Sequence, residues 1–299
     1  MCGIVGLHLR EPSLYPRLGE LLTGMLSQVC ERGPDSAGMA VYGDPRWSPP
    51  GSATVSVLPG AHRAEEVRAA VAAELPGADV AVVDAGQTVL VSAPTEAEAL
   101  VTAVRAAVPG IVVIGFGEDL AVLKGVGHPE ALAAEVGLAA AQGWQGVAHT
   151  RMATESAVTP EGSHPFAVGP DQCLVHNGSF ANHATIRREL IAAGMEFDSQ
   201  NDSEVGARFV AAQLAAGYDL EKSLKLLCER FDGFYTLLVA NRDSFAVVRD
   251  AIACKPAIIA EAPDWVAMAS EYRALAGLPG VESARIFEPE PEEVYAWQR

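Results

Sequence analysis

The second residue of the chain is a cysteine, which becomes the N-terminus if Met1 is removed. A trimmed Cys2 carries a nucleophile and a base on one residue, because a free α-amino group titrates near pH ~8 and a thiol near ~8.5. The amine can then take the thiol proton directly or through one water molecule. Cys2 is therefore a candidate nucleophile for acyl transfer. Taken alone, a cysteine at this position is more often an incidental small hydrophobic residue without catalytic use.

Acyl transfer from an amide also needs hydrogen-bond donors for the developing oxyanion. The segment His176-Asn177-Gly178-Ser179, at the expected end of a strand, offers an amide side chain beside an unobstructed backbone N–H. Losing one such donor typically costs about 100- to 1,000-fold in rate. An Asn-Gly pair can also be an ordinary turn.

An amino-acid substrate presents a carboxylate and an ammonium group, which require a guanidinium and an acid at opposite ends of a small pocket. Arg151, at the end of an expected strand, and Asp202, just ahead of an expected helix, are candidates for these two positions. The alternatives are a surface salt bridge for Arg151 and a helix N-cap for Asp202.

Six short segments, taken together and in this order, resemble the class II, N-terminal-nucleophile glutamine amidotransferases. They are residues 1–6 (MCGIVG), 32–38 (RGPDSAG), 149–154 (HTRMAT), 163–166 (SHPF), 176–178 (HNG) and 201–204 (NDSE). The resemblance covers residues 1–42 and 146 to about 275. Two departures from the usual pattern follow Arg151: Met152 replaces an aromatic residue, and Glu155-Ser156 replace His-Gly.

The resemblance implies a role for each matching residue. Cys2 would be the nucleophile, and Asn177 and Gly178 would form the oxyanion hole. Arg151 would bind the α-carboxylate of glutamine, and Asp202 its α-ammonium group with help from Gly178.

Four further residues would contribute to the substrate pocket by the same resemblance. Arg32 and Gly33 would lie on a loop that covers glutamine, and Thr154 would lie at the end of the arginine motif. His164 would shape the pocket. With no carboxylate evident beside it, His164 could instead be a structural histidine.

The fold implied by the resemblance is α+β, a four-layer αββα sandwich of two antiparallel sheets between helices. Residues 1–299 would form one amidotransferase domain, interrupted at about 43–146 by an inserted α/β module with no recognisable catalytic residues. Hydrophobic periodicity predicts a strand at 3–9, a helix at 14–30, a strand at 39–42 and a helix at 130–142.

Charge and cysteine content exclude several classes of partner. The formal charge is −17 at pH 7, so the chain lacks the basic surface that nucleic acids or anionic membranes require. Five cysteines without a C-x-x-C pair argue against a disulfide framework and against a metal site. No apolar run reaches transmembrane length and no signal peptide is evident, so we expect a cytoplasmic protein.

The resemblance implies a glutaminase that hydrolyses L-glutamine to glutamate and ammonia through a γ-glutamyl thioester. The chain is similar to the stand-alone amidotransferase subunit of glutamate-synthase-like systems, including N-methylglutamate synthase. The expected partners are a flavin-binding synthase subunit and a β-helical subunit. We expect no cofactor in this chain, and FMN and iron–sulfur clusters only in those partners. The alternatives are a free-standing amidohydrolase of the same fold acting on another amide, and a non-catalytic glutamine-sensing scaffold.

Overall fold

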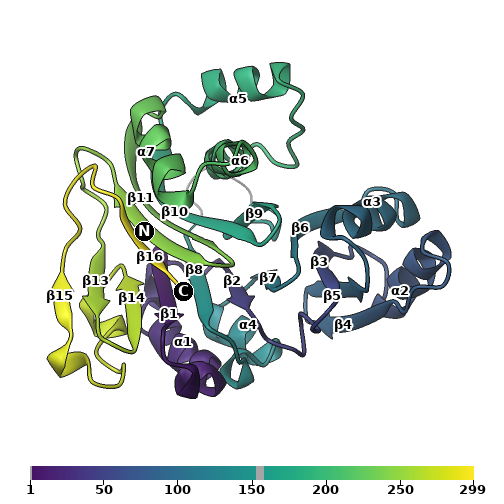
Figure 1. Ribbon diagram of the computed structural model, residues 1–299, viewed down its shortest axis with the longest axis horizontal. Coiled ribbons are helices and arrows are strands. Elements are labelled where there is room, and N and C mark those ends of the chain that lie inside the picture. The colour runs from purple at the N-terminus through teal and green to yellow at the C-terminus, as the bar shows by residue number, and fades with distance from the viewer. Residues whose placement is uncertain (1, 153–157) are drawn as a thin grey trace.

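Two antiparallel β-sheets pack face to face at the centre of the molecule (Figure 1). The computed structural model describes residues 2–152 and 158–299. The larger sheet has seven strands in the spatial order β15 (Arg285–Phe287), β13 (Ile258–Glu261), β14 (Trp265–Ala269), β1 (Gly3–Leu9), β8 (Gln145–Arg151), β2 (Ser36–Tyr42) and β7 (Leu120–Val126). The smaller sheet has five, in the order β16 (Tyr295–Gln298), β12 (Ser244–Arg249), β11 (Gly233–Asn241), β10 (Gln172–Phe180) and β9 (Phe166–Gly169).

Helices cover the outer face of each sheet. The larger sheet is covered by α1 (Leu18–Ser27) and α4 (Pro129–Glu135), and the smaller by α5 (His183–Ala192), α6 (Asp202–Ala215) and α7 (Leu220–Arg230). Short 3-10 helices are η1 (Pro12–Arg17), η2 (Cys30–Arg32), η3 (Leu138–Ala140), η4 (Tyr272–Ala274) and η5 (Val281–Ser283).

Three hydrophobic cores separate these four layers. Leu22 belongs to the core between α1 and the larger sheet, Phe245 to the core between the two sheets, and Leu224 to the core beneath α5–α7. Alternate residues of a strand point to opposite faces, so a central strand such as β1 supplies Leu7 to one core and Ile4 to the next. The predicted four-layer αββα sandwich is therefore confirmed.

A third sheet, with four strands, lies to one side of the sandwich, at the right of Figure 1. Its elements are β3 (Ala53–Leu58), α2 (Ala64–Glu74), β4 (Ala81–Ala85), β5 (Thr88–Ala93), α3 (Ala97–Ala107) and β6 (Val112–Gly117). The β-α-β-β-α-β sequence with spatial order β4-β5-β3-β6 is the split βαβ arrangement. Val55, Val91 and Leu100 lie in a hydrophobic core that this unit forms by itself.

The inserted unit is shorter than predicted. The expected module reached about residue 146, but β7 is an edge strand of the larger sheet and α4 packs on α1. Tyr42 at the end of β2 pairs with Leu120 at the start of β7. The unit is thus inserted into the turn of a β2–β7 hairpin.

Two predicted helices are also shorter than expected. The helix predicted at 14–30 is α1 flanked by η1 and η2, and Pro16 lies inside η1, where its missing N–H rules out regular helix. The helix predicted at 130–142 ends after Glu135, because Gly137 adopts a left-handed conformation with φ of 68°. The strand predicted at 39–42 begins earlier, at Ser36.

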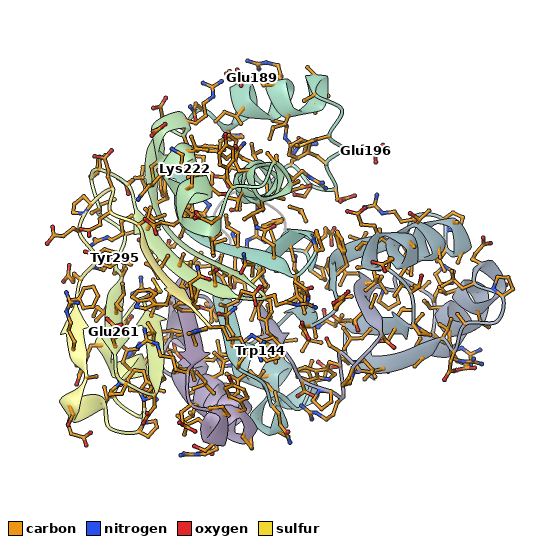
Figure 2. The ribbon with its side chains drawn as sticks, in the orientation of Figure 1. Trp144, Glu189, Glu196, Lys222, Glu261 and Tyr295 are labelled. Carbon is orange, nitrogen blue, oxygen red and sulfur yellow. The ribbon has the colours of Figure 1, made fainter. Side chains whose placement is uncertain are left out.

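Polar contacts also connect the two sheets to each other. The indole Nε1 of Trp297 in β16 donates to the carboxylate of Glu261 in β13, at 3.0 Å. Trp144, which precedes β8, donates from its Nε1 to the carbonyl oxygen of Arg242 in the β11–β12 turn, at 3.0 Å. Glu261 and Trp144 are labelled in Figure 2. Among the described residues, no helix has the length and apolar character needed to span a membrane.

Candidate active site

Cys2 lies directly before β1, a central strand of the larger sheet. Its carbonyl oxygen accepts hydrogen bonds from Arg32 Nε at 3.0 Å and from Asn177 Nδ2 at 3.4 Å. The next residue is also fixed, because Gly3 N–H donates to Thr150 Oγ1 at 3.1 Å. Cys2 itself is half-buried. Cys2 is thus held by η2 and by the smaller sheet, and its neighbour Gly3 by the larger sheet.

Asn177 and Gly178 lie in β10, the strand of the smaller sheet that faces β1 and β8. They were expected at the end of this strand, but β10 continues to Phe180, and the two residues pair with Thr236 and Tyr235 of β11. Gly178 has a φ of 147°, and an added Cβ would lie 2.0 Å from the carbonyl oxygen of Phe234. The position therefore requires glycine.

A cleft of about 920 Å³ brings together three of the predicted residues. Arg151, Gly178 and Asp202 all line it, and the other lining residues are Thr159, Glu161, Gly162, Ser179, His183, Phe197, Asp198, Ser199, Gln200 and Asn201. Arg151 is nearly buried at the end of β8. The cleft thus contains a cation and an anion, as binding of a zwitterionic amino acid requires.

Asp202 is the first residue of α6 rather than the residue ahead of it. The N-cap is Asn201, whose side chain accepts a hydrogen bond from Ser203 N–H at 2.9 Å. The carboxylate of Asp202 accepts a hydrogen bond from Phe180 N–H at 2.8 Å, which fixes it against the end of β10. The capping alternative considered for Asp202 therefore belongs to its neighbour.

Arg32 and Gly33 contact Cys2 and Arg151, respectively, and are not among the residues that line the cleft. Besides contacting Cys2, Arg32 makes an ion pair with Glu271 at 2.7 Å. Gly33 packs on the backbone of Arg151, where an added Cβ would lie 2.5 Å from the Arg151 carbonyl carbon. A role for these two residues in covering glutamine stays a prediction. Thr154 lies outside the described residues.

His164 is buried beneath the cleft and is not a lining residue. Its Nε2 lies 2.9 Å from Ser203 Oγ, and its ring lies 4.1 Å from that of His149, centroid to centroid. His176 Nδ1 contacts the same hydroxyl at 2.7 Å. Burial lowers the pKa of His149 to about 3 and that of His176 to about 4, and it holds the pKa of His164 well below the ordinary value. The three rings are therefore neutral at pH 7, and His164 supports Ser203 beside Asp202.

Four polar residues that position the site were not predicted from the sequence. Ser270 Oγ accepts a hydrogen bond from Ile4 N–H at 2.9 Å, next to the Glu271 carboxylate that binds Arg32. Thr150 holds Gly3, and Ser203 bridges two of the buried histidines. Thr150 and Ser203 lie inside recognised motifs. Ser270 and Glu271 directly follow a strand, which was the available signal for them.

Comparison with known proteins identifies the family. The model of the glutamine amidotransferase domain matches residues 149–277, which include Arg151, Asn177, Gly178 and Asp202. A glutamine amidotransferase-like protein from Rhizobium meliloti, GlxB, is 47% identical over 298 residues, covering 99% of this chain and 98% of that protein. This chain belongs to the class II glutamine amidotransferases. The expected family and the expectation that the chain is an enzyme are thereby confirmed.

Two further proteins are similar to this amidotransferase over part of their own length. Over 115 residues it is 35% identical to the glutamine–fructose-6-phosphate aminotransferase of Streptomyces coelicolor, covering 38% of this chain and 19% of that protein. The solved structure of glutamine phosphoribosylpyrophosphate amidotransferase from B. subtilis superposes with a TM-score of 0.61 at 17% identity. The superposition covers 99% of this amidotransferase and 49% of that chain, so this chain spans about half the length of the solved one. At this level of identity the likeness is one of fold.

Proposed function

We propose that this chain is a glutaminase subunit that hydrolyses L-glutamine to glutamate and ammonia through a γ-glutamyl thioester on Cys2. One observation carries the proposal: Arg151, Gly178 and Asp202 line one cleft, while the Asn177 side chain reaches Cys2. Because glutamine has a carboxylate and an ammonium group, Arg151 and Asp202 would orient it. Its side-chain amide would then face the N-terminal residue.

In the proposed reaction, the α-amine of Cys2 takes the thiol proton and the thiolate attacks the amide carbon of glutamine. Asn177 Nδ2 and the Gly178 N–H donate to the negative amide oxygen. The amine returns the proton to nitrogen, the C–N bond breaks and ammonia leaves. Water then cleaves the thioester, releasing glutamate and restoring the thiol.

The nucleophile can be tested with a glutamine analogue that carries an electrophilic side chain, followed by peptide mapping and intact-mass analysis. Cys2 should be labelled in protein that has lost Met1, and ammonia release should stop. Cys254 is exposed and serves as the internal control, since a non-specific alkylating agent should label it as well. Burial raises the pKa of Cys30 to about 11 and that of Cys173 to about 12, so both should stay unlabelled. Labelling of Cys254 with Cys2 untouched, or full activity with Met1 retained, would refute this mechanism.

We also propose that the ammonia passes to a separate subunit, a glutamate-synthase-like subunit that binds flavin. The proposed complex also includes a β-helical subunit. N-methylglutamate synthase is one system of this type. The inserted unit, residues 53–117, is the proposed docking element, because it has its own core and projects from the side of the sandwich (Figure 1). We expect this complex in the cytoplasm.

The hairpin connection allows a clean test of the docking proposal. Since Tyr42 and Leu120 are paired, residues 43–119 can be replaced by a two-residue Asn-Gly turn that joins β2 to β7. The full-length chain should co-purify with a flavin-binding synthase subunit, and the shortened chain should not, while both hydrolyse glutamine. If the full-length chain never binds such a partner and prefers another amide, the free-standing amidohydrolase is correct.

A further inference from the structure

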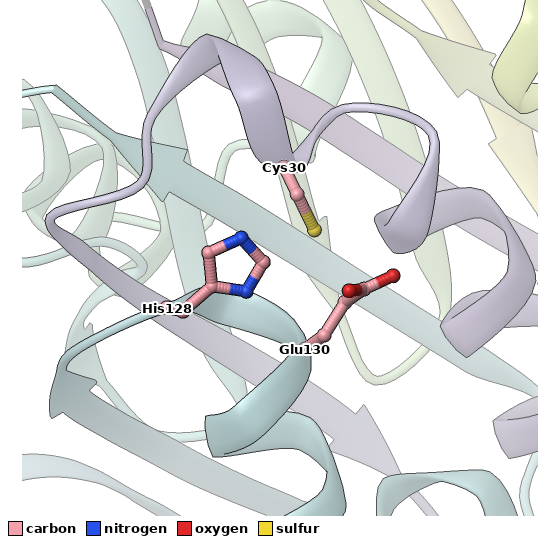
Figure 3. A group of neighbouring side chains, drawn as sticks. All are labelled: Cys30, His128 and Glu130. Atoms are coloured by element: carbon pink, nitrogen blue, oxygen red, sulfur yellow. The ribbon is translucent and has the colours of Figure 1, made fainter.

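Three metal-ligating side chains converge outside the cleft. The sulfur of Cys30, a ring nitrogen of His128 and a carboxylate oxygen of Glu130 all lie within 4.8 Å of one another. Figure 3 shows the Cys30 sulfur pointing into the space between the imidazole and the carboxylate. They come from η2 and from the start of α4, segments nearly one hundred residues apart in sequence. Among residues 2–152 and 158–299, this is the one such group of three or more.

The surroundings of the three side chains are suited to a ligand. Cys30 is 3% exposed, and its thiol donates a hydrogen bond to the Leu26 carbonyl oxygen at 3.3 Å. His128 and Glu130 are exposed at the mouth of the group. Within the described part of the chain, neither the His128 ring nor the Glu130 carboxylate has a hydrogen-bond or ion-pair partner. Two ligand atoms are thus available to a cation from solvent, beside a sulfur that is already in place.

We propose that Cys30, His128 and Glu130 bind a divalent cation of the zinc class, with the fourth coordination position open to water. Thiolate, imidazole and carboxylate oxygen are the ligand types that zinc takes in proteins, and three protein ligands leave one open position. Binding replaces the thiol proton, which passes to solvent, so that the sulfur coordinates as thiolate.

The position of this site gives a bound cation a structural effect. Cys30 begins η2, which ends at Arg32, the residue that binds the Cys2 carbonyl oxygen. His128 and Glu130 lie where the chain enters α4 after β7. A cation held by all three side chains would cross-link the turn that carries Arg32 to the segment that returns from the inserted unit.

The site can be tested by titrating the full-length chain with cobalt(II) and competing the cobalt with zinc(II). The parent for these measurements should carry Cys2→Ala, because an N-terminal cysteine chelates metals through its own amine and thiol. Cobalt should give a thiolate charge-transfer band in the near ultraviolet at one equivalent per chain. His128→Gln and Glu130→Gln should each weaken cobalt binding by at least about 100-fold. Loss of a residue that only hydrogen-bonds to a metal ligand typically weakens metal affinity by about 10- to 100-fold, so loss of a ligand itself should cost at least the upper value.

Matched controls are His62→Gln and Glu74→Gln, which alter exposed residues of the inserted unit and should leave affinity unchanged. Cys30 is buried, so Cys30→Ser can fail through misfolding, and the two exposed variants carry the test. As a second readout, zinc should raise the Tm of the parent by mass action and leave that of His128→Gln unchanged. Absence of the thiolate band, or equal cobalt affinity in the parent and in His128→Gln, would overturn the proposal.

Discussion

Arg32 Nε lies 3.0 Å from the carbonyl oxygen of Cys2, so this arginine holds the backbone of the proposed nucleophile. The same guanidinium donates to Glu271, whose pKa is lowered mainly by that hydrogen bond. Glu271 follows β14, which pairs with β1. Arg32 therefore ties the start of β1 to the end of its neighbouring strand.

Arg32→Lys should lower kcat by about 10- to 100-fold with little change in KM, because a hydrogen bond involving a charged group contributes about 1.5–3 kcal/mol. Lysine has no planar fork with which to reach Cys2 and Glu271 together. Glu271→Gln should act in the same direction and less strongly. Steady-state glutaminase kinetics measure both. Arg17→Lys, in an exposed ion pair with Glu20, is the control. A rise in KM alone for Arg32→Lys would favour the covering role over the positioning role.

Gly178→Ala should lower kcat by at least about 100-fold, the usual loss when one oxyanion donor is displaced. The new methyl group cannot fit beside the Phe234 carbonyl oxygen, so β10 must move away from β11. Gly194→Ala is a matched control, since Gly194 also has positive φ, 93°, but has open space around it. Gly194→Ala therefore measures the effect of a strained backbone alone, without the steric clash that Gly178→Ala introduces. If the two variants were equally active, the oxyanion assignment for Gly178 would be wrong.

The four-layer fold was predictable from the sequence through motifs, whereas several strands were not. β7 was missed because Lys124 interrupts its apolar run, although this lysine is buried. β15 and β16 are three and four residues long and flank an acidic segment, so neither gives a clear alternation. The spatial order of strands depends on contacts between distant segments, which local patterns do not contain.

In the site, too, residues within short motifs could be predicted, whereas residues brought in by strand pairing could not. Cys2, Asn177 and Asp202 belong to short motifs, so their chemistry could be recognised before their positions were known. Ser270 and Glu271 reach the start of β1 only because β14 pairs with it, with Ala269 opposite Val5. No local pattern connects residues so far apart, and their supporting role emerged from the fold.

Arg151→Lys and Asp202→Asn should each weaken transition-state binding by something on the order of 2–4 kcal/mol, or roughly 30- to 1,000-fold in kcat/KM for glutamine. Lysine loses the bidentate guanidinium, and asparagine loses the charge that would face the ammonium group. Arg230→Lys and Asp243→Asn, both away from the cleft residues, are the charge-matched controls. Unchanged kcat/KM in both cleft variants, with Tm intact, would mean that glutamine is bound elsewhere.

The three buried histidines predict a loss of stability in mild acid. Their folded-state pKa values lie below the ordinary 6.5, so below pH 6.5 the unfolded chain binds more protons than the folded one. Each histidine should then reduce the free energy of unfolding by about 1.4 kcal/mol per pH unit as pH falls from about 6.5 to 5. Urea unfolding at a series of pH values measures this slope.

His149→Gln removes one of these titrating groups and should make the slope shallower, whereas the exposed His62→Gln should leave it unchanged. The window stops above pH 5 because carboxylates such as Glu271, whose pKa is lowered from 4.5, begin to contribute below that value. Equal slopes for the parent and His149→Gln would mean that His149 is accessible to protons in the folded protein.

Lys124 adds a pH dependence of the same sign at higher pH, where stability again rises with pH. Its side chain is buried in β7 with Nζ 4.8 Å from the ring centroid of Phe166. Burial lowers its pKa from 10.5 to about 7, and the charges of Glu204 and Glu161 offset only part of this effect. The folded chain therefore binds fewer protons than the unfolded chain between about pH 7 and 10.5, and the cost of burying the lysine is fully present at the lower end of that window.

Lys124→Met should accordingly stabilise the protein by about 1–4 kcal/mol near pH 7, the range found when buried ionic groups are replaced by apolar residues of similar volume. The gain should shrink as pH approaches 10, because the unfolded lysine then loses its proton as well. Urea unfolding at both pH values measures the difference, with Lys225→Met, in an exposed pair with Glu221, as the control. Destabilisation of Lys124→Met at pH 7 would mean that the attraction of Glu204 and Glu161 outweighs desolvation, and that the lysine is charged inside the fold.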